Sequence, residues 1–293
     1  MNTPYGWNVC LPWQGDPAQL WKTQQSLELL QPDRWMDYYC AEPVQWPGYV
    51  PTVRSWHLDG VVAPAVIERL LNHHDGETWI LFNEGHVSDQ DDIAPDKARN
   101  LALKFINLAH ALDVDMNWCS ANASVNFPAQ HAGGLSGQSW WRVFLRLLRR
   151  AGIGSPSMHG VHLYHSTDRA MLQATWRTLT NEWRRAWIGD KPIIITEVCA
   201  ENQPFDQQAE VMDECLRLLE IGREQGPAGR DGVMGVFWFA AWDYGLWRNC
   251  ALCEVDPDKA KTMRLTPLGA HWKELQSLLS SSRFANHVTL KSA

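Results

Sequence analysis

The feature that most constrains this chain is a repeated alternation of short apolar runs and longer segments with helical spacing. Such alternation predicts a parallel sheet whose strands are joined by crossover helices. Eight runs are expected to be strands: residues 5–10, 35–40, 49–56, 79–84, 115–121, 160–165, 191–199 and 233–242. Helical patterns occur at residues 16–30, 64–74, 101–112, 139–150, 169–187, 207–225 and 266–279. Only the second strand lacks a well-defined helix after it.

Eight strand–helix units are expected to close into a barrel rather than to form an open sheet. The fold class predicted is α/β, a (β/α)8 TIM barrel, with a single domain over residues 1–293. An open nucleotide-binding sheet, the alternative, would have a glycine-rich turn after its first strand. The segment CLPWQGD at that position has no such turn. No linker or change of composition divides the chain.

Charge and hydropathy limit the partners of this chain. The net charge is -7 without a long run of either sign, so the basic surface typical of nucleic-acid binding is missing. No apolar segment is long enough for a membrane span, and the first ten residues do not resemble a signal peptide. We therefore expect no nucleic-acid or membrane partner and a monomer, while the compartment stays open.

The chain contains 7 cysteines, an odd number that does not indicate a disulfide framework. Most lie in or beside apolar runs, which favours buried free thiols. Cys250 and Cys253 form a single CxxC pair, which alone is a weak metal signal. A local disulfide between these two residues is the alternative if the protein is exported.

Tryptophan is unusually abundant, with 17 residues. Flat indole faces stack on the apolar faces of sugar rings, so a tryptophan-rich cleft suits a carbohydrate ligand. Packing in the core is the alternative for at least half of these residues. The abundance therefore favours a sugar ligand without establishing one.

Two glutamates follow apolar strands, where a charge is costly to bury. Glu84 ends the fourth strand in FNEGH, and Glu197 ends the seventh in ITEVCA. Barrel enzymes carry their chemistry at the carboxyl ends of the strands, and the fourth and seventh strands lie on opposite sides of the mouth. Two carboxyl groups facing each other there can hydrolyse a glycosidic bond, one as acid and one as nucleophile. For either glutamate alone, a structural ion pair or cap is an equal alternative.

The chain resembles the clan of retaining glycoside hydrolases with (β/α)8 barrels and catalytic glutamates on strands four and seven. Asn83 and Glu84 match the first two residues of the clan's Asn-Glu-Pro motif, and Ile195-Thr196-Glu197 is similar to its nucleophile motif. The resemblance implies that Glu84 is the acid/base and Glu197 the nucleophile, with no cofactor or metal. The segment NEGHVSDQDDIAPDKA looks most like the endo-β-1,3-glucanase type, with an alkali-sensitive-linkage-like catalytic domain.

Other members of the clan carry a His and a Tyr on strand six and a Trp on strand eight, which His162, Tyr164 and Trp238 match. We expect His162 to orient a sugar hydroxyl or a catalytic neighbour, Tyr164 to donate to Glu197, and Trp238 to form a sugar platform. For Tyr164 and Trp238 simple packing is the alternative.

Further candidates come from the chemistry of their side chains. Asn83 is expected to bond a sugar 2-hydroxyl, or alternatively to tie loops together. Trp56 and Trp118 are expected to form cleft walls, with Trp7, Trp46 and Trp242 as weaker candidates. Arg54 is expected either to pair with a catalytic carboxylate or to form a surface ion pair.

Gly85 stands where the clan usually has Pro, and its flexible backbone could loosen Glu84. This departure motivates a second hypothesis, a carbohydrate-binding or inactive barrel. A third hypothesis, a metal-dependent barrel enzyme using His57, His162 and His165 with Glu84, lacks the paired histidines expected on the first strand. The sequence thus predicts a retaining hydrolase of a β-linked polysaccharide, with β-1,3-glucan as a candidate substrate.

Overall fold

The computed structural model describes residues 6–12, 15–40, 44–61, 64–88, 90–124, 134–154, 156–164, 168–181, 189, 191–200, 202–225, 232–243 and 249–280. Within them, eight parallel strands form one sheet in the order β2-β1-β8-β7-β6-β5-β4-β3. A bridge between Trp35 and Tyr49 brings the two edges of this sheet together. The nearly closed ring confirms the predicted (β/α)8 barrel.

The strands of the ring are short, as expected for a barrel of this size. They are β1 (Gly6–Cys10), β2 (Trp35–Met36), β3 (Thr52–Val53), β4 (Thr78–Leu81), β5 (Asn117–Ser124), β6 (Met158–Leu163), β7 (Ile193–Val198) and β8 (Gly235–Phe239). The predicted strands 35–40 and 49–56 were too long, because only the first two residues of the former and two central residues of the latter form strands. The fourth strand ends at Leu81, so Glu84 follows the strand and does not end it.

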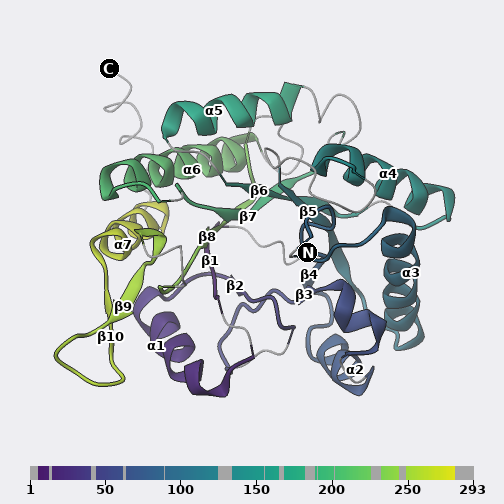
Figure 1. The fold of residues 1–293 in the computed structure, drawn as a ribbon, viewed down its shortest axis with the longest axis horizontal. Helices are drawn as coiled ribbons and strands as arrows, with labels where there is room; N and C mark the ends of the chain where they lie inside the picture. The colour runs from purple at the N-terminus through teal and green to yellow at the C-terminus, as the bar shows by residue number, and fades with distance from the viewer. Residues whose placement is uncertain are drawn as a thin grey trace.

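Helices surround the ring, as Figure 1 shows. They are α1 (Leu20–Leu30), α2 (Pro64–His73), α3 (Pro95–Ala111), α4 (Gly137–Arg150), α5 (Arg169–Thr178), α6 (Phe205–Gln225) and α7 (Pro267–Ser280). A 3-10 turn, η1 (Pro17–Gln19), precedes α1, and a π turn, η2 (His57–Val61), precedes α2. Among the described residues between β2 and β3 there is no helix, in line with the weak pattern there. Within the predicted helix 169–187 the structure has α5 followed by a π turn over residues 179–181, and residues 182–188 lie outside the described part.

One element was not predicted, a two-stranded antiparallel hairpin of β9 (Cys253–Val255) and β10 (Met263–Leu265). It lies beside α1 and α7 at the outside of the barrel (Figure 1). This hairpin does not take part in the ring of strands, so it leaves the barrel topology unchanged.

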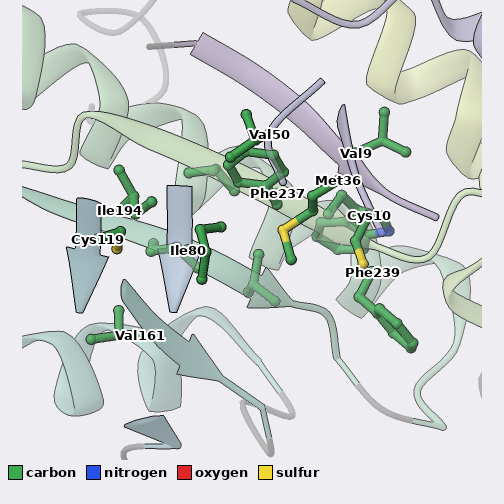
Figure 2. Packing of buried hydrophobic residues seen from close by; sticks show 14 of the residues in the cluster. Val9, Cys10, Met36, Val50, Ile80, Cys119, Val161, Ile194, Phe237 and Phe239 are labelled. Carbon is green, nitrogen blue, oxygen red and sulfur yellow. The ribbon is translucent and has the colours of Figure 1, made fainter. Parts of the chain in front are cut away.

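Apolar side chains fill both sides of the strand ring. Trp7 stacks on Trp272 of α7 with ring centroids 6.3 Å apart, so it faces the helices. On the inner side, Cys10 is paired in register with both Met36 and Phe239. Figure 2 shows these three side chains close together at one end of the core. The inner packing therefore extends to the carboxyl ends of β1, β2 and β8.

All seven cysteines are buried free thiols, as predicted for most of them. Cys250 and Cys253 do not form a disulfide; the Cys250 sulfur accepts a hydrogen bond from Gln208 Nε2 at 3.1 Å. In the part of the chain that the structure describes, no helix is both long enough and apolar enough to cross a membrane.

Candidate active site

A β-bulge on β7 aims Glu197 into the barrel. His159 on β6 packs against Trp141 of α4, so it faces the helices, and it is paired in register with Ile193. Strict alternation from Ile193 would turn Glu197 toward the helices as well. The register shifts by one residue after Ile195, and Glu197 is paired with His162 on the inner side. Thr196, the extra residue, donates from Oγ1 to the Val161 carbonyl at 3.2 Å.

Glu84 reaches the same place from the end of β4 through an unusual backbone. Phe82 and Glu84 both have positive φ angles, 66° and 44°, a conformation that side chains other than glycine rarely adopt. The Phe82 ring packs edge-on against Phe144 of α4, with centroids 5.9 Å apart. The chain therefore turns sharply at Asn83 and directs the Glu84 carboxyl inward, where Oε1 lies 2.9 Å from His162 Nδ1.

His162 connects the two glutamates. Its Nδ1 lies 2.9 Å from Glu84 Oε1, and its Nε2 lies 3.5 Å from Glu197 Oε1. The ring is fully buried, whereas the side chains of Glu84 and Glu197 are 10% and 6% exposed. The imidazole thus lies beneath two carboxyl groups that reach the solvent. His162 is thus in contact with both glutamates, and its predicted role of orienting a catalytic neighbour or a sugar hydroxyl stays a prediction.

The surroundings give the two carboxyl groups different acidities. Burial raises the pKa of Glu197 well above its ordinary value. Burial acts in the same direction on Glu84, but the nearby His162, the hydrogen bond with it, His86 and Arg54 together lower the pKa of Glu84. Negative charge is therefore better stabilised at Glu84 than at Glu197.

Two aromatic side chains, Tyr164 after β6 and Phe239 on β8, lie next to His162 and the glutamates. Tyr164 packs edge-on against His162, with centroids 5.6 Å apart, and against Phe239, 6.0 Å away. Tyr164 is thus beside the site as expected, and its hydrogen bond to Glu197 stays a prediction. Phe239 was missed, because the run VFWFAAW has aromatic residues on both faces of the strand.

Trp238 does not form the predicted sugar platform, and this prediction is wrong in the structure. Trp238 is paired in register with Val9, two residues after Trp7, so all three face the helices. Its side chain has no exposed surface, and its Nε1 donates to the Cys250 carbonyl at 2.9 Å. The inward position next to it belongs to Phe239.

Trp118 does not form a cleft wall either, so this prediction is also wrong. It lies near the start of β5, paired with Trp79, whose ring packs against Phe105 of α3. The carboxyl end of the barrel, where the glutamates lie, is several residues further along. Trp7 and Trp242, weaker candidates for the same role, are fully or almost fully buried.

Trp56 differs from the other tryptophans. It follows β3, is partly exposed, and meets Tyr39 edge-on with ring centroids 5.3 Å apart. Tyr39 follows β2 and is 38% exposed. Both residues lie after strands that end at the mouth, so the expected cleft-wall role of Trp56 stays a prediction.

Asn83 and Arg54 take part in contacts between loops. Asn83 donates from Nδ2 to Gln90 Oε1 at 3.0 Å, which is the loop-tying alternative; its bond to a sugar 2-hydroxyl stays a prediction. Arg54 pairs with Asp91, its Nε lying 2.9 Å from Asp91 Oδ1. Arg54 therefore does not pair directly with a catalytic carboxylate, although its charge acts on Glu84.

Gly85 has a packing role that the sequence did not reveal. A Cβ atom at this position would lie 2.4 Å from Cζ2 of Trp140 on α4. The same indole donates from Nε1 to the Ile93 carbonyl at 2.6 Å, which fixes its position. Glycine is therefore required by the close approach of Trp140, and a proline here would meet the same ring.

Two further side chains near the glutamates were not predicted as site residues. Burial and the Glu197 charge raise the pKa of the Cys10 thiol well above its ordinary value. Burial, Cys10 and the Glu84 charge likewise raise the pKa of Tyr38. Both groups are thus neutral neighbours from the ends of β1 and β2. Their sequence context, an apolar run and an aromatic pair, carries no catalytic signal.

Most of the chain matches the model of a known family. The model of the family described as "Glycosyl hydrolase catalytic core" matches residues 42–270, most of the chain. The chain belongs to this family. The predicted glycoside hydrolase is thereby confirmed at the level of the enzyme class. Comparison with curated proteins gave no match.

Solved structures of other glycosyl hydrolases share the fold of this one. A GH128 subgroup II endo-β-1,3-glucanase from Sorangium cellulosum has a TM-score of 0.63 at 17% identity, covering 91% of this chain and 98% of that one. A GH128 subgroup I endo-β-1,3-glucanase from Amycolatopsis mediterranei, in complex with laminaritriose, has a TM-score of 0.60 at 14% identity, covering 93% of this chain and 100% of that one. A GH128 subgroup III curdlan-specific exo-β-1,3-glucanase from Blastomyces gilchristii has a TM-score of 0.57 at 16% identity, covering 90% of this chain and 97% of that one.

The third hypothesis, a metal-dependent enzyme, depended on a histidine cluster. Among the described residues of this glycosyl hydrolase, no group of three or more His, Cys, Asp or Glu side chains could hold a metal ion. His57 accepts a hydrogen bond at Nδ1 from the Arg54 backbone at 2.8 Å, and His162 is engaged with the glutamates. His165 lies outside the described residues.

Proposed function

We propose that this protein hydrolyses β-1,3-glucan with retention of the anomeric configuration, with Glu84 as acid/base and Glu197 as nucleophile. The observation that carries the proposal is the buried His162 ring, which contacts both carboxyl groups at the carboxyl ends of β4 and β7. A sugar that enters from solvent meets both glutamates above this ring. Family membership supports the chemistry, and the fold shared with three β-1,3-glucanases supports the substrate class.

Double displacement assigns a distinct step to each carboxyl group. Glu84 donates its proton to the departing glycosidic oxygen while a Glu197 oxygen attacks the anomeric carbon and forms a glycosyl ester. Glu84, now ionised, then removes a proton from water, and that water displaces Glu197 from the sugar. The second step returns the proton to Glu84 and frees the Glu197 carboxylate.

His162 supplies a route to the protonation state that the first step needs. A proton on Nδ1 lies on the 2.9 Å contact with Glu84 Oε1 and can move to that oxygen. The move makes Glu84 the acid of the first step. His162 Nε2 lies 3.5 Å from Glu197 Oε1, and a proton on this nitrogen favours the ionised form of that carboxyl. Glu197 releases its own proton to solvent before it attacks, because its burial favours the neutral form.

The aromatic pair Tyr39–Trp56 is a suitable wall for the substrate. Trp56 is partly exposed and Tyr39 is 38% exposed, at the ends of β3 and β2. Aromatic faces bury the apolar surface of a sugar ring at little cost in conformational freedom. We expect this pair to bind a glucosyl unit beside the cleaved bond.

The product formed first by the wild-type protein tests this function. Proton NMR during hydrolysis of a soluble β-1,3-glucan is expected to detect the β anomer before mutarotation. Early appearance of the α anomer would overturn retention. Binding of the glucan without any turnover would favour the second hypothesis, an inactive carbohydrate-binding barrel.

A further inference from the structure

The loop after β4 contains a buried carboxylate outside the pair assigned to catalysis. Asp91 is 7% exposed as a residue, and its side chain has no exposed surface. A buried carboxylate is costly unless each oxygen is well satisfied by donors. The donors around Asp91 come from the ends of two different strands, β3 and β4.

One oxygen of Asp91 is directed at the end of β3. Oδ1 accepts from Arg54 Nε at 2.9 Å, from the Ser55 backbone at 3.0 Å and from Ser55 Oγ at 3.0 Å. Arg54 is fixed from its other side as well, since its backbone N–H donates to His57 Nδ1 at 2.8 Å. Burial and the Arg54 charge lower the pKa of His57 to about 3, so this imidazole is neutral and able to accept.

The other oxygen holds the residue next to the acid/base. Oδ2 accepts from the Asn83 backbone N–H at 2.5 Å, and the Asp91 N–H donates to the Asn83 carbonyl at 3.2 Å. Asn83 lies between Phe82 and Glu84, the two residues with positive φ. Such a conformation is strained and persists only where surrounding contacts hold it. Asp91 provides two of those contacts.

We propose that Asp91 is a positioning residue for Glu84. It fixes the strained turn at Asn83, and its negative charge counters the Arg54 charge that would otherwise act more strongly on the Glu84 carboxyl. The inference rests on the proposed role of Glu84. Losing the Asp91 charge would release a guanidinium group that is 9% exposed as a residue and already acts on Glu84. The freed cation would favour ionised Glu84, the form that cannot protonate a leaving group.

The direction of the pH effect follows from the groups that face Glu84. These are His162 on β6, Arg54 after β3, Tyr38 after β2 and His86 in its own loop. Asp91→Asn leaves Arg54 without its counter-charge, so Glu84 is expected to titrate at lower pH. Arg54→Gln removes the cation and keeps the Asp91 bond to Asn83, so Glu84 is expected to titrate at higher pH. A merely structural role for Asp91 would leave the Glu84 titration unmoved in Asp91→Asn.

Carbon-13 NMR of glutamate-labelled protein tests this directly, with the Glu84 signal assigned by its loss in Glu84→Gln. Asp91→Asn is expected to lower the Glu84 midpoint by about half a pH unit or more, and Arg54→Gln to raise it. Asp92→Asn is the matched control, because this exposed neighbour also has positive φ, which Asn tolerates. An unchanged midpoint in Asp91→Asn would overturn the proposal; if Asp91→Asn does not fold, the kcat of the double variant Asp91→Asn/Arg54→Gln against that of Arg54→Gln decides, and equal values would overturn it.

Kinetics separate this inference from the proposed function. Asp91→Asn is expected to lower kcat on β-1,3-glucan about tenfold or more and to lower kcat on an activated aryl glycoside by less. The basic limb of its pH–rate profile is expected to shift to lower pH. In the double variant Asp91→Asn/Arg54→Gln, the position of this limb is expected to be restored, whereas kcat is not. Equal losses on both substrates with an unmoved limb would refute the positioning role. A wild type that is inactive on every β-glucan would refute the proposed function. The NMR titration would still test whether Asp91 controls the pKa of Glu84.

Discussion

Glu84 and Glu197 carry the same functional group, but the side chains around them differ. Glu84 is surrounded by His162, His86 and Arg54, whereas burial dominates the environment of Glu197. The cations and the hydrogen bond around Glu84 favour its ionised form, whereas burial favours the neutral form of Glu197. The proposed roles need the opposite states, a proton on Glu84 and none on Glu197, and the 2.9 Å contact with His162 offers Glu84 a partner for proton exchange.

The acid role of Glu84 predicts a dependence on the leaving group. Glu84→Ala is expected to reduce kcat/KM on β-1,3-glucan by about a hundredfold or more, because its sugar leaving group needs protonation. An aryl glycoside with an acidic phenol leaves without help and should lose far less at this step. Steady-state kinetics on both substrates checks this, with Glu197→Ala as the control that should abolish both activities. Equal losses in Glu84→Ala would contradict the acid role.

Sequence reasoning identified both glutamates because a carboxylate after an apolar strand is conspicuous. It could not identify Phe239 in place of Trp238, since the two are adjacent aromatics and only the register with Val9 and Cys10 decides which one faces inward. Asp91 was hidden for a different reason. It is one of several acidic residues in its loop, and its importance comes from contacts with Arg54 and Asn83 that are made only on folding.

At the scale of elements, the bulge on β7 was the feature that sequence could not provide. Alternation along Ile193–Val198 turns Glu197 outward unless one residue is skipped, and nothing in the run IIITEV marks Thr196 as that residue. The order of strands and helices was predictable because it depends on repeated apolar patterns. The short lengths of β2 and β3 were not, because pairing there is limited to two residues each.

The packing of α4 on the loop after β4 predicts the effect of a side chain at position 85. Gly85→Ala places a methyl group against the rigid Trp140 ring and is expected to cost about 1–3 kcal/mol of unfolding free energy. Trp140→Leu should also destabilise, through its lost packing and its lost bond to Ile93. Because the two changes share one contact, the double variant is expected to lose less than the sum. Urea denaturation of the three variants checks this, and strict additivity would contradict the contact.

At the scale of the whole molecule, the active site is expected to reduce stability. The pKa of Glu197 is raised in the folded state above its ordinary value of 4.5, so the native protein binds this proton more tightly than the unfolded chain. The resulting penalty is absent at pH well below 4.5 and grows as pH rises from there toward the folded-state pKa. It is fully present above that pKa.

Glu197→Gln should therefore stabilise the protein at neutral pH, by about 1 kcal/mol or more, equivalent to a rise in Tm of about 2 °C. The gain is expected to vanish near pH 4. Glu84→Gln serves as the control, because the lowered pKa of Glu84 contributes stability at neutral pH that the amide would lose. Calorimetry between pH 4 and 7 measures both, and a gain from Glu197→Gln that does not depend on pH would contradict this account.

The barrel brings β4 and β7 to opposite sides of one mouth, and His162 on β6 joins their glutamates. The most direct test is to trap the glycosyl ester with an activated 2-deoxy-2-fluoro-β-glucoside or its 1,3-linked disaccharide. Fluorine slows both steps, while the good leaving group keeps the first one fast enough to accumulate the ester. Mass spectrometry of the digested protein is expected to find the sugar on Glu197. A sugar on Glu84, or turnover of the reagent with no ester at any residue, would contradict the account.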